Sequence, residues 1–312
     1  MACTIAFTPL SAADHEAVAR LLHRSLVDWY ESRLRQGARF GDSPEPFRIF
    51  PEVYEALDPG EAVTARDEDS GDLLGVCFSH ERETHVAVGI VATAPEAAGR
   101  GIARSMMQAV LAKAQALGKP ARLVSSLFNL DSFSLYTRLG FVPGAIFQDL
   151  LLSVPAEGLA AAAPEGVERV RPARVDEAAR LADFEQSLQG IHREKDYAFF
   201  LANRAGSWQV LVSEDAEGHL NGALVVSDHP NFTMIGPGVA VDETSGAALL
   251  WRALDLLRGR TVVFLVPCAA AGLVRTAYGW GARNVELHVA QSTAPVGGTR
   301  GLVFPTFLPE SG

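Results

Sequence analysis

The chain has 312 residues, about twice the length of a common single domain, so its length predicts two domains. Hydrophobic residues make up 48% and charged residues 21%, which is typical of a globular protein with a large core and argues against disorder over most of the chain. The 27 basic and 37 acidic residues give a net charge of −10, which argues against nucleic acid or an anionic membrane as the main partner and favours a cationic small substrate.

The N-terminal segment and the cysteines predict a cytoplasmic protein without a metal site. The N-terminal sequence MACTIAFTPLSAADHE becomes polar too early for a secretory signal peptide. The longest nearly apolar run, 262–274, contains Pro267 and is shorter than the about 20 residues that a membrane-spanning helix needs. Cys3, Cys77 and Cys268 are far apart and form no CxxC pair or Cys/His cluster, so we expect neither disulfides nor structural zinc.

Both halves of the chain begin in the same way. The segment FTPLSAADHEAVARLL (7–22) is similar to VRPARVDEAARLADF (170–184), and each predicts a short strand, a proline and an amphipathic helix. In the first, Ser11 and Asp14 resemble a capping box. The segment 28–60 that follows is rich in aromatic and acidic residues, which could hold an organic cation or could form a contact between domains.

Two predicted hairpins and several glycines indicate an internal repeat. AVTARDEDSGDLLGVCF from Ala62 and QVLVSEDAEGHLNGALVV from Gln209 alternate apolar and polar residues around a turn. Three glycine pairs share an offset of 147, and Gly140 matches Gly279 at an offset of 139; the first three pairs are Gly71/Gly218, Gly75/Gly222 and Gly89/Gly236. The second copy is therefore predicted to be shorter by 147 − 139 = 8 residues, about two helical turns, between Gly236 and Gly279.

A segment rich in Ala, Gly and Pro separates the two copies. PAEGLAAAAPEG begins at Pro155 and has few residues that could enter a core, which is typical of a linker. We therefore expect a first domain at 1–154, a linker at 155–165 and a second domain at 166–312.

The segment from Thr84 predicts an anion-binding turn. A β-type run at 85–94 is followed by Pro95, Gly99-Arg100-Gly101 and a helix at about 102–117. Backbone N–H groups of a glycine-containing loop at a helix N-terminus can bind phosphate, although a tight strand-to-helix turn explains the same glycines. The loop is no P-loop, since no Gly-Lys-Ser/Thr follows, and it lacks a full GxGxxG pattern, since Arg104 stands at the third position after Gly101.

The next segment makes the pattern more specific. In RLVSSLFNLDSFSLYTRLGFVP, from Arg122, a strand leads to Asn129, a short helix with Tyr136, and then Gly140-Phe141. In this order the two segments resemble motifs A and B of the GNAT acetyltransferase superfamily over residues 60–150. One position departs from the family pattern, because Ala98 stands where Arg or Gln is usual.

The resemblance implies a fold and an activity. The implied fold is α/β (α+β), with two tandem GNAT-like domains, each a mixed, mostly antiparallel sheet flanked by helices. The implied function is acyl-CoA-dependent N-acyl transfer through a ternary complex, from acetyl-CoA to a primary amine of a small molecule or a protein. A non-catalytic acyl-CoA-binding or sensing protein is the alternative, motivated by Ala98 and by the uncertain general base.

The resemblance also assigns roles to residues. The pyrophosphate of the cofactor would lie on the loop and helix start, and the pantetheine arm and thioester carbonyl would meet Val91, Ala92 and Thr93. Asn129 and Ser132 would contact the arm from the other side, and the Tyr136 hydroxyl would protonate the departing thiolate. Asn129 could instead cap its helix, and Tyr136 could be an ordinary buried residue. The loop residues implied are Gly99, Arg100, Gly101, Ile102 and Ala103.

The general base is assigned to the segment HERETH, 80–85. His85 occupies the position that the resemblance assigns to the family's usual carboxylate, and histidine in general can exchange a proton near neutral pH, while Glu83 lies two residues earlier and is expected on the same strand face. Glu81 and His80 are further candidates. The segment could equally be a polar hairpin tip.

The second copy is predicted to have lost these groups. Its counterpart of the glycine loop is DETSGAALL (242–250), with one glycine and acidic neighbours. At the stated offsets, Asn129 corresponds to Cys268, Tyr136 to Arg275 and His85 to Phe232. We therefore expect the second domain to keep the fold without catalysis.

Overall fold

The computed structural model describes residues 4–294 and 299–309, so Cys3 lies outside the described residues. The chain divides into two compact units. Unit 1 contains residues 4–81, 85–121 and 307–309, and unit 2 contains residues 82–84, 122–294 and 299–306. These units do not follow the repeat boundaries expected at 154 and 166, which stay a prediction about the sequence.

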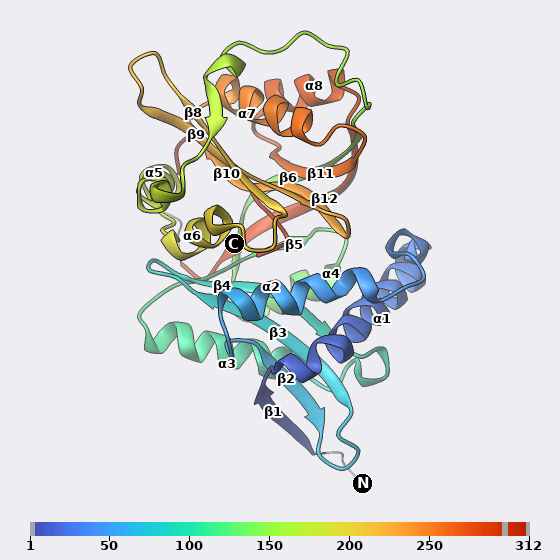
Figure 1. Ribbon diagram of the computed structural model, residues 1–312. Coiled ribbons are helices and arrows are strands. Elements are labelled where there is room, and N and C mark those ends of the chain that lie inside the picture. Colours follow the sequence, from blue (N-terminus) through green and yellow to red (C-terminus); the bar gives the residue numbers. More distant parts are fainter. Residues whose placement is uncertain (1–3, 295–298, 310–312) are drawn as a thin grey trace. The chain divides into compact units, whose positions relative to one another are not determined.

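Unit 1 contains an antiparallel sheet in the order β1-β2-β3-β4 (Figure 1). The hairpin predicted from Ala62 is confirmed as β2 and β3, and the predicted β-type run forms β4. The strands are β1 (Ile5–Pro9), β2 (Val63–Asp67), β3 (Leu73–Glu81) and β4 (Val86–Thr93).

Helices cover both faces of this sheet. The helices are α1 (His15–Leu34), α2 (Ile49–Leu57) and α3 (Ile102–Ala116). Tyr54 of α2 stacks on Phe78, whereas a side chain at Gly75 would meet α3. Because Gly75 and Phe78 point to opposite faces of the strand, α2 and α3 lie on opposite sides of the sheet.

Unit 2 contains a larger sheet, in the order β5-β12-β6-β11-β10-β9-β8-β7, with β13 also paired to β10. The hairpin predicted from Gln209 is confirmed as β8 and β9. Most pairs are antiparallel, while β10 and β11 are parallel, as the expected mixed fold requires. The strands are β5 (Ala121–Ser126), β6 (Val142–Ser153), β7 (Val170–Pro172), β8 (Trp208–Glu214), β9 (Leu220–His229), β10 (Phe232–Ala240), β11 (Thr261–Pro267), β12 (Arg283–Ser292) and β13 (Leu302–Phe304).

The two sequence copies exchange their last long strands within unit 2. β12, from the second copy, pairs with β5 of the first copy. β6, from the first copy, pairs with β11 of the second and also with β12. The exchange gives a physical reason why the compact units do not end at the linker.

Helices also cover both faces of the unit 2 sheet. The helices are α4 (Leu130–Arg138), α5 (Ala178–Gln189), α6 (Glu194–Ala202), α7 (Glu243–Leu256) and α8 (Ala271–Gly279). Phe200 of α6 packs on Trp208, while Leu211 on the other face of β8 joins the core built around α7. None of the described helices in either unit is long and apolar enough to cross a membrane.

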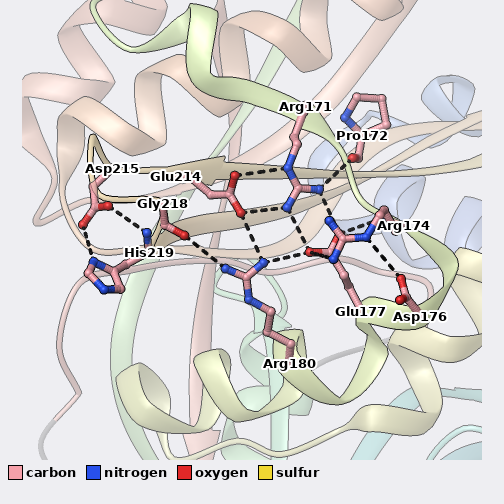
Figure 2. A network of polar contacts seen from close by, with 10 residues as sticks. All are labelled: Arg171, Pro172, Arg174, Asp176, Glu177, Arg180, Glu214, Asp215, Gly218 and His219. Atoms are coloured by element: carbon pink, nitrogen blue, oxygen red, sulfur yellow. Dashed lines mark hydrogen bonds and ion pairs between the residues drawn. The ribbon is translucent and has the colours of Figure 1, made fainter.

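A network of ion pairs links β7, β8 and the start of α5 in unit 2 (Figure 2). Arg171 bonds both oxygens of Glu177, at 2.8 and 2.9 Å, and reaches Glu214 at 2.7 Å. Arg180 joins the same two carboxylates at 2.8 and 3.1 Å. The side chain of Glu177 is only 2% exposed, so its charge depends on these arginines.

Candidate functional site

The loop between β4 and α3 holds the predicted phosphate-binding residues in unit 1. Gly99 and Gly101 have φ angles of +78° and +80°, a left-handed conformation that glycine adopts without strain. Both are exposed, and a Cβ at either would have no neighbour within 4 Å. The backbone of this loop is therefore open to a ligand.

The N-terminus of α3 is left uncapped. Gly101 is its N-cap and has no side chain, and no acidic residue lies in the first turn. The first N–H groups of a helix have no intrahelical acceptor, and the helix dipole favours an anion there. Ile102 is buried and anchors the helix, whereas Arg100 and Arg104 are exposed beside it. The turn has the features of a diphosphate site.

Strand β4 carries a β-bulge just before the predicted pantetheine-binding residues. Cys77 of β3 pairs with Val91, and Ser79 pairs with Val88, so β4 has one extra residue between them. A bulge changes the direction of the peptide groups next to it. Gly89 lies in this bulge, and a Cβ there would be 2.9 Å from the Tyr54 hydroxyl, so close packing requires glycine.

The candidate bases lie in different surroundings. The side chain of Glu83, in unit 2, is half exposed and lies 3.5 Å from Nδ1 of His192. Residues 82–85 form the turn between β3 and β4, so the expectation that Glu83 and His85 lie on one strand face is wrong. The segment is a hairpin turn, but His85, in unit 1, is only 1% exposed.

The two further candidates are held by neighbours in unit 1. Glu81 accepts a hydrogen bond from Lys119 at 3.0 Å, and this bond lowers the pKa of the Glu81 carboxyl. The His80 imidazole is buried, lies 2.5 Å from Asp58 through Nδ1 and stacks on Tyr54.

Helix α4 of unit 2 carries the remaining predicted residues. Asn129 is the N-cap, and its Oδ1 accepts a hydrogen bond from the Ser132 backbone N–H at 3.0 Å. The Ser132 hydroxyl donates to the Asn129 carbonyl. The structural alternative for Asn129, a helix cap, is thus present. Tyr136 is 7% exposed, with its ring 5.9 Å from that of Phe141.

Strand register shows where the two copies correspond. Gly75 pairs with Thr93 in unit 1, and Gly222 pairs with Ala240 in unit 2, so the offset of 147 holds across both hairpins. The bulge recurs as well, between Ile235 and Gly238.

The later correspondence differs from the sequence-based one. Gly140 follows α4 at φ +93°, and its counterpart after α8 is Gly281 at φ +100°, not Gly279. The offset is therefore 141 rather than 139. Asn129 corresponds to Ala270 instead of Cys268, and Tyr136 to Ala277 instead of Arg275.

The deletion in the second copy removes the glycine loop rather than two helical turns. The N-caps Gly101 and Asp242 also differ by 141, so 147 − 141 = 6 residues are lost between β10 and α7. The Asp242 carboxylate caps α7 by accepting the Ser245 N–H at 2.8 Å. It occupies the position where an anion would bind at α3.

A strand of the chain itself covers the second copy's counterpart of the pantetheine-binding strand. Val91–Thr93 correspond to Gly238, Val239 and Ala240 at the offset of 147. These three residues pair with β13, at Phe304, Val303 and Leu302. Strand β13 was not predicted from the sequence, because a strand of three residues is too short to show an alternating pattern.

The aromatic segment of unit 1 is filled by its own side chains. The rings of Tyr30 and Phe40 lie 4.8 Å apart, and the Arg39 guanidinium covers both, at 5.0 and 5.6 Å. The Arg39 side chain therefore occupies these two rings, which the sequence analysis had considered as a site for an organic cation.

One group of described residues has metal-ligand spacing, at the β8–β9 turn. The ligand atoms of Asp215, Glu217 and His219 lie within 4.8 Å of one another. The Asp215 carboxylate already accepts the N–H groups of Glu217 and His219, as Figure 2 shows for His219. These hydrogen bonds stabilise the turn and explain why the three side chains lie close together, so we assign no metal to them.

Comparisons with known proteins found a matching family model and similar solved structures. A sequence model described as the acetyltransferase (GNAT) family matches residues 23–141. No curated protein matches the chain in sequence.

Solved structures are similar over nearly the whole length. A Pyrococcus horikoshii protein described as an acetyltransferase has a TM-score of 0.72 and 14% identity, over 98% of this chain and 95% of that one. A GCN5-related N-acetyltransferase of Sphaerobacter thermophilus has a TM-score of 0.64 and 18% identity, over 94% and 96%. A tandem GNAT protein of the clavulanic acid biosynthesis pathway has a TM-score of 0.59 and 16% identity, over 94% and 99%. At these identities the similarity establishes the fold.

Proposed function

We propose that this chain, whose residues 23–141 match the GNAT family model and whose fold is similar to that of a tandem GNAT protein, transfers an acetyl group from acetyl-CoA to a primary amine. The observation that carries the proposal is the open, uncapped start of α3, with Gly99 and Gly101 left-handed and Arg100 exposed. Backbone amides and the helix dipole there favour the diphosphate of a coenzyme. Arg100 and Arg104 supply positive charge where Ala98 cannot.

We further propose that one acetyl-CoA binds per chain, at the first copy. The equivalent helix start in the second copy is capped by Asp242, and Glu243 adds a second acid to its first turn. The equivalent strand segment is paired with β13. Both features oppose binding of a diphosphate and its pantetheine arm to the second copy.

The transfer requires three groups. A base takes a proton from the ammonium, so that the amine nitrogen can attack the thioester carbonyl; the carbon–sulfur bond then breaks, and an acid protonates the thiolate. We assign the acid to Tyr136 and the base to His85, with Glu83 as the alternative. N–H groups at Val91–Thr93, after the bulge, would polarise the carbonyl.

The test is release of free thiol from acetyl-CoA with a panel of primary amines, in the full chain. For Tyr136→Phe we expect kcat to fall at least about 100-fold, since a general acid contributes about that much. Tyr278→Phe in α8 is the control, with unchanged kcat. Full activity in Tyr136→Phe would exclude the acid role, and binding of CoA without thiol release from any amine would favour the sensing alternative.

The base is identified by the pH dependence of kcat/KM in His85→Gln and Glu83→Gln. A base must be deprotonated to act, so the rate of the wild-type protein falls toward low pH. The variant in which this fall disappears, together with most of the rate, identifies the base. If both variants keep the wild-type profile, neither residue is the base.

A further inference from the structure

Unit 2 contains a cavity of about 510 Å³ that the proposed acetyl transfer does not use. It lies where β6 begins and β11 and β12 end, and Leu302 and Val303 of β13 form part of its wall. A volume of this size fits a small molecule. Much of the wall is apolar and includes Val142, Pro143, Ala145, Phe147, Pro267 and Ala270.

One cation lines this cavity. Arg122, at the start of β5, lies opposite Ser292 of β12. Within residues 4–294 and 299–309, its guanidinium makes no hydrogen bond or ion pair. A guanidinium that is only partly exposed and has no protein partner among these residues is costly, so it favours a bound anion.

The acid that acts on Arg122 most strongly already has a partner. Glu185 attracts Arg122, yet both Glu185 oxygens are bonded to Arg193, at 2.8 and 2.6 Å. Both members of this pair are fully buried. Burial lowers the pKa of Arg122 to about 10, so it stays protonated at neutral pH. The three groups together therefore carry one uncompensated positive charge.

We propose that this cavity binds a small organic carboxylate, with its charged end on Arg122 and its apolar part against the wall formed by β6 and Pro267. A guanidinium matches a carboxylate through two parallel hydrogen bonds. One guanidinium compensates one negative charge, whereas inorganic phosphate carries up to two. The cavity also includes Glu243, whose carboxylate accepts the Leu273 N–H at 2.6 Å and would repel a second negative charge.

The test is titration calorimetry on the full chain with acetate, butyrate, hexanoate and benzoate. Hexanamide, which keeps the apolar part without the charge, and inorganic phosphate are the comparison ligands. We expect binding of at least one carboxylate and at least about tenfold weaker binding in Arg122→Gln. Arg204→Gln removes an exposed arginine of unit 2 and is expected to bind as the wild type does.

A second variant separates the cavity from the charge. Ala145 lines the cavity and is exposed, so Ala145→Phe fills space without disturbing the core. It should abolish binding while Arg122 remains. Without ligand, Arg122→Gln should not lower Tm, because it removes an uncompensated charge.

Three results would overturn the proposal: no carboxylate binds at millimolar concentration, hexanamide or phosphate binds as tightly as the best carboxylate, or both variants bind as the wild type does. Because binding rather than turnover is measured, this proposal can fail while acetyl transfer stands.

Discussion

Gly101 and Asp242 occupy equivalent positions before α3 and α7, and the difference between them predicts the effect of one substitution. Gly101→Asp would place a carboxylate at the start of α3, where Asp242 stands before α7, although the backbone is left-handed at Gly101 and extended at Asp242. The carboxylate would repel the phosphates of the coenzyme at the helix start. We expect CoA to bind at least about tenfold more weakly than in Gly101→Asn, measured by calorimetry.

Gly101→Asn is the matched control, because both side chains have nearly the same shape and tolerate a positive φ to a similar degree. The comparison therefore isolates the charge. Equal CoA affinity in the two variants would show that phosphate does not bind at this turn, even if both variants bind less tightly than the wild type.

Glu177 predicts a pH dependence of stability. The hydrogen bonds from Arg171, with smaller contributions from Arg174 and Arg180, lower the pKa of the buried Glu177 carboxyl from an ordinary 4.5 to about 2. Since the folded-state pKa is the lower one, the stabilisation is present above about pH 4.5 and is lost as the pH falls toward 2. We expect Glu177→Gln to lower the free energy of unfolding by about 1–3 kcal/mol at pH 7.

Urea denaturation at pH 7 and pH 3 measures this effect. The loss caused by Glu177→Gln should be smaller at pH 3, because part of the wild-type stabilisation has disappeared there. Asp176→Asn is the control: this neighbouring side chain is 80% exposed and should change little at either pH. A loss of equal size at both pH values would contradict the assigned pKa.

Single residues show how far sequence reasoning reaches. The turn before α3 was predicted correctly, because its backbone has positive φ angles at two positions and glycine is the residue that adopts such angles without strain. The burial of His85 could not be predicted, because the segment 80–85 is polar and its burial arises from tertiary packing. Asparagine is a suitable residue both for capping a helix and for contacting a ligand, so the sequence left both roles of Asn129 open.

At the level of elements, alternation and turn residues correctly predicted both hairpins, and glycine and proline bounded α3. The later alignment of the copies was wrong by two residues because it matched letters, Tyr-Gly-Trp with Leu-Gly-Phe. The feature that repeats is a left-handed glycine after a helix, Gly140 and Gly281, and this depends on backbone conformation rather than on neighbouring residue types.

Strand β13 predicts a difference in hydrogen exchange between β4 and β10. The Gly238–Ala240 segment is already paired with β13, whereas Val91–Thr93 are proposed to gain a partner when CoA binds. Exchange followed by mass spectrometry should show slower exchange at 88–104 on addition of CoA and no change at 235–248. Protection of both segments by CoA would contradict a single coenzyme site per chain.

At the level of the whole molecule, the sequence predicted two copies but not their exchange of strands. β6 and β12 are equivalent strands with similar alternation, so either could pair with β5 or with β11 without changing which side chains face the core. The alternation of apolar and polar residues determines which side chains of a strand face the core, but not which strand pairs with it. Only the tertiary structure distinguishes the exchanged arrangement from one in which β6 pairs with β5 and β12 with β11.

The exchange predicts that neither copy folds alone. In unit 2, β6 pairs with β11 on one edge and with β12 on the other, and both partners follow the linker. A chain of residues 1–154 would lack both strands that pair with the twelve-residue β6 in the intact protein, together with the second copy's side chains that help to bury Phe147 and Leu150 there. We expect this fragment to aggregate or to lack cooperative unfolding in calorimetry.

Co-expression tests whether β11 and β12, supplied on a separate chain, allow the fragment 1–154 to fold. Co-expression of 1–154 with 155–312 should restore a soluble one-to-one complex with a cooperative transition, because every strand of the unit 2 sheet is then present. Neither chain should show a cooperative unfolding transition when it is produced alone. A fragment 1–154 that is monomeric, unfolds cooperatively and binds CoA with the affinity of the full chain would show that the exchanged strands are not needed for the fold, and would return the domain boundary to the linker.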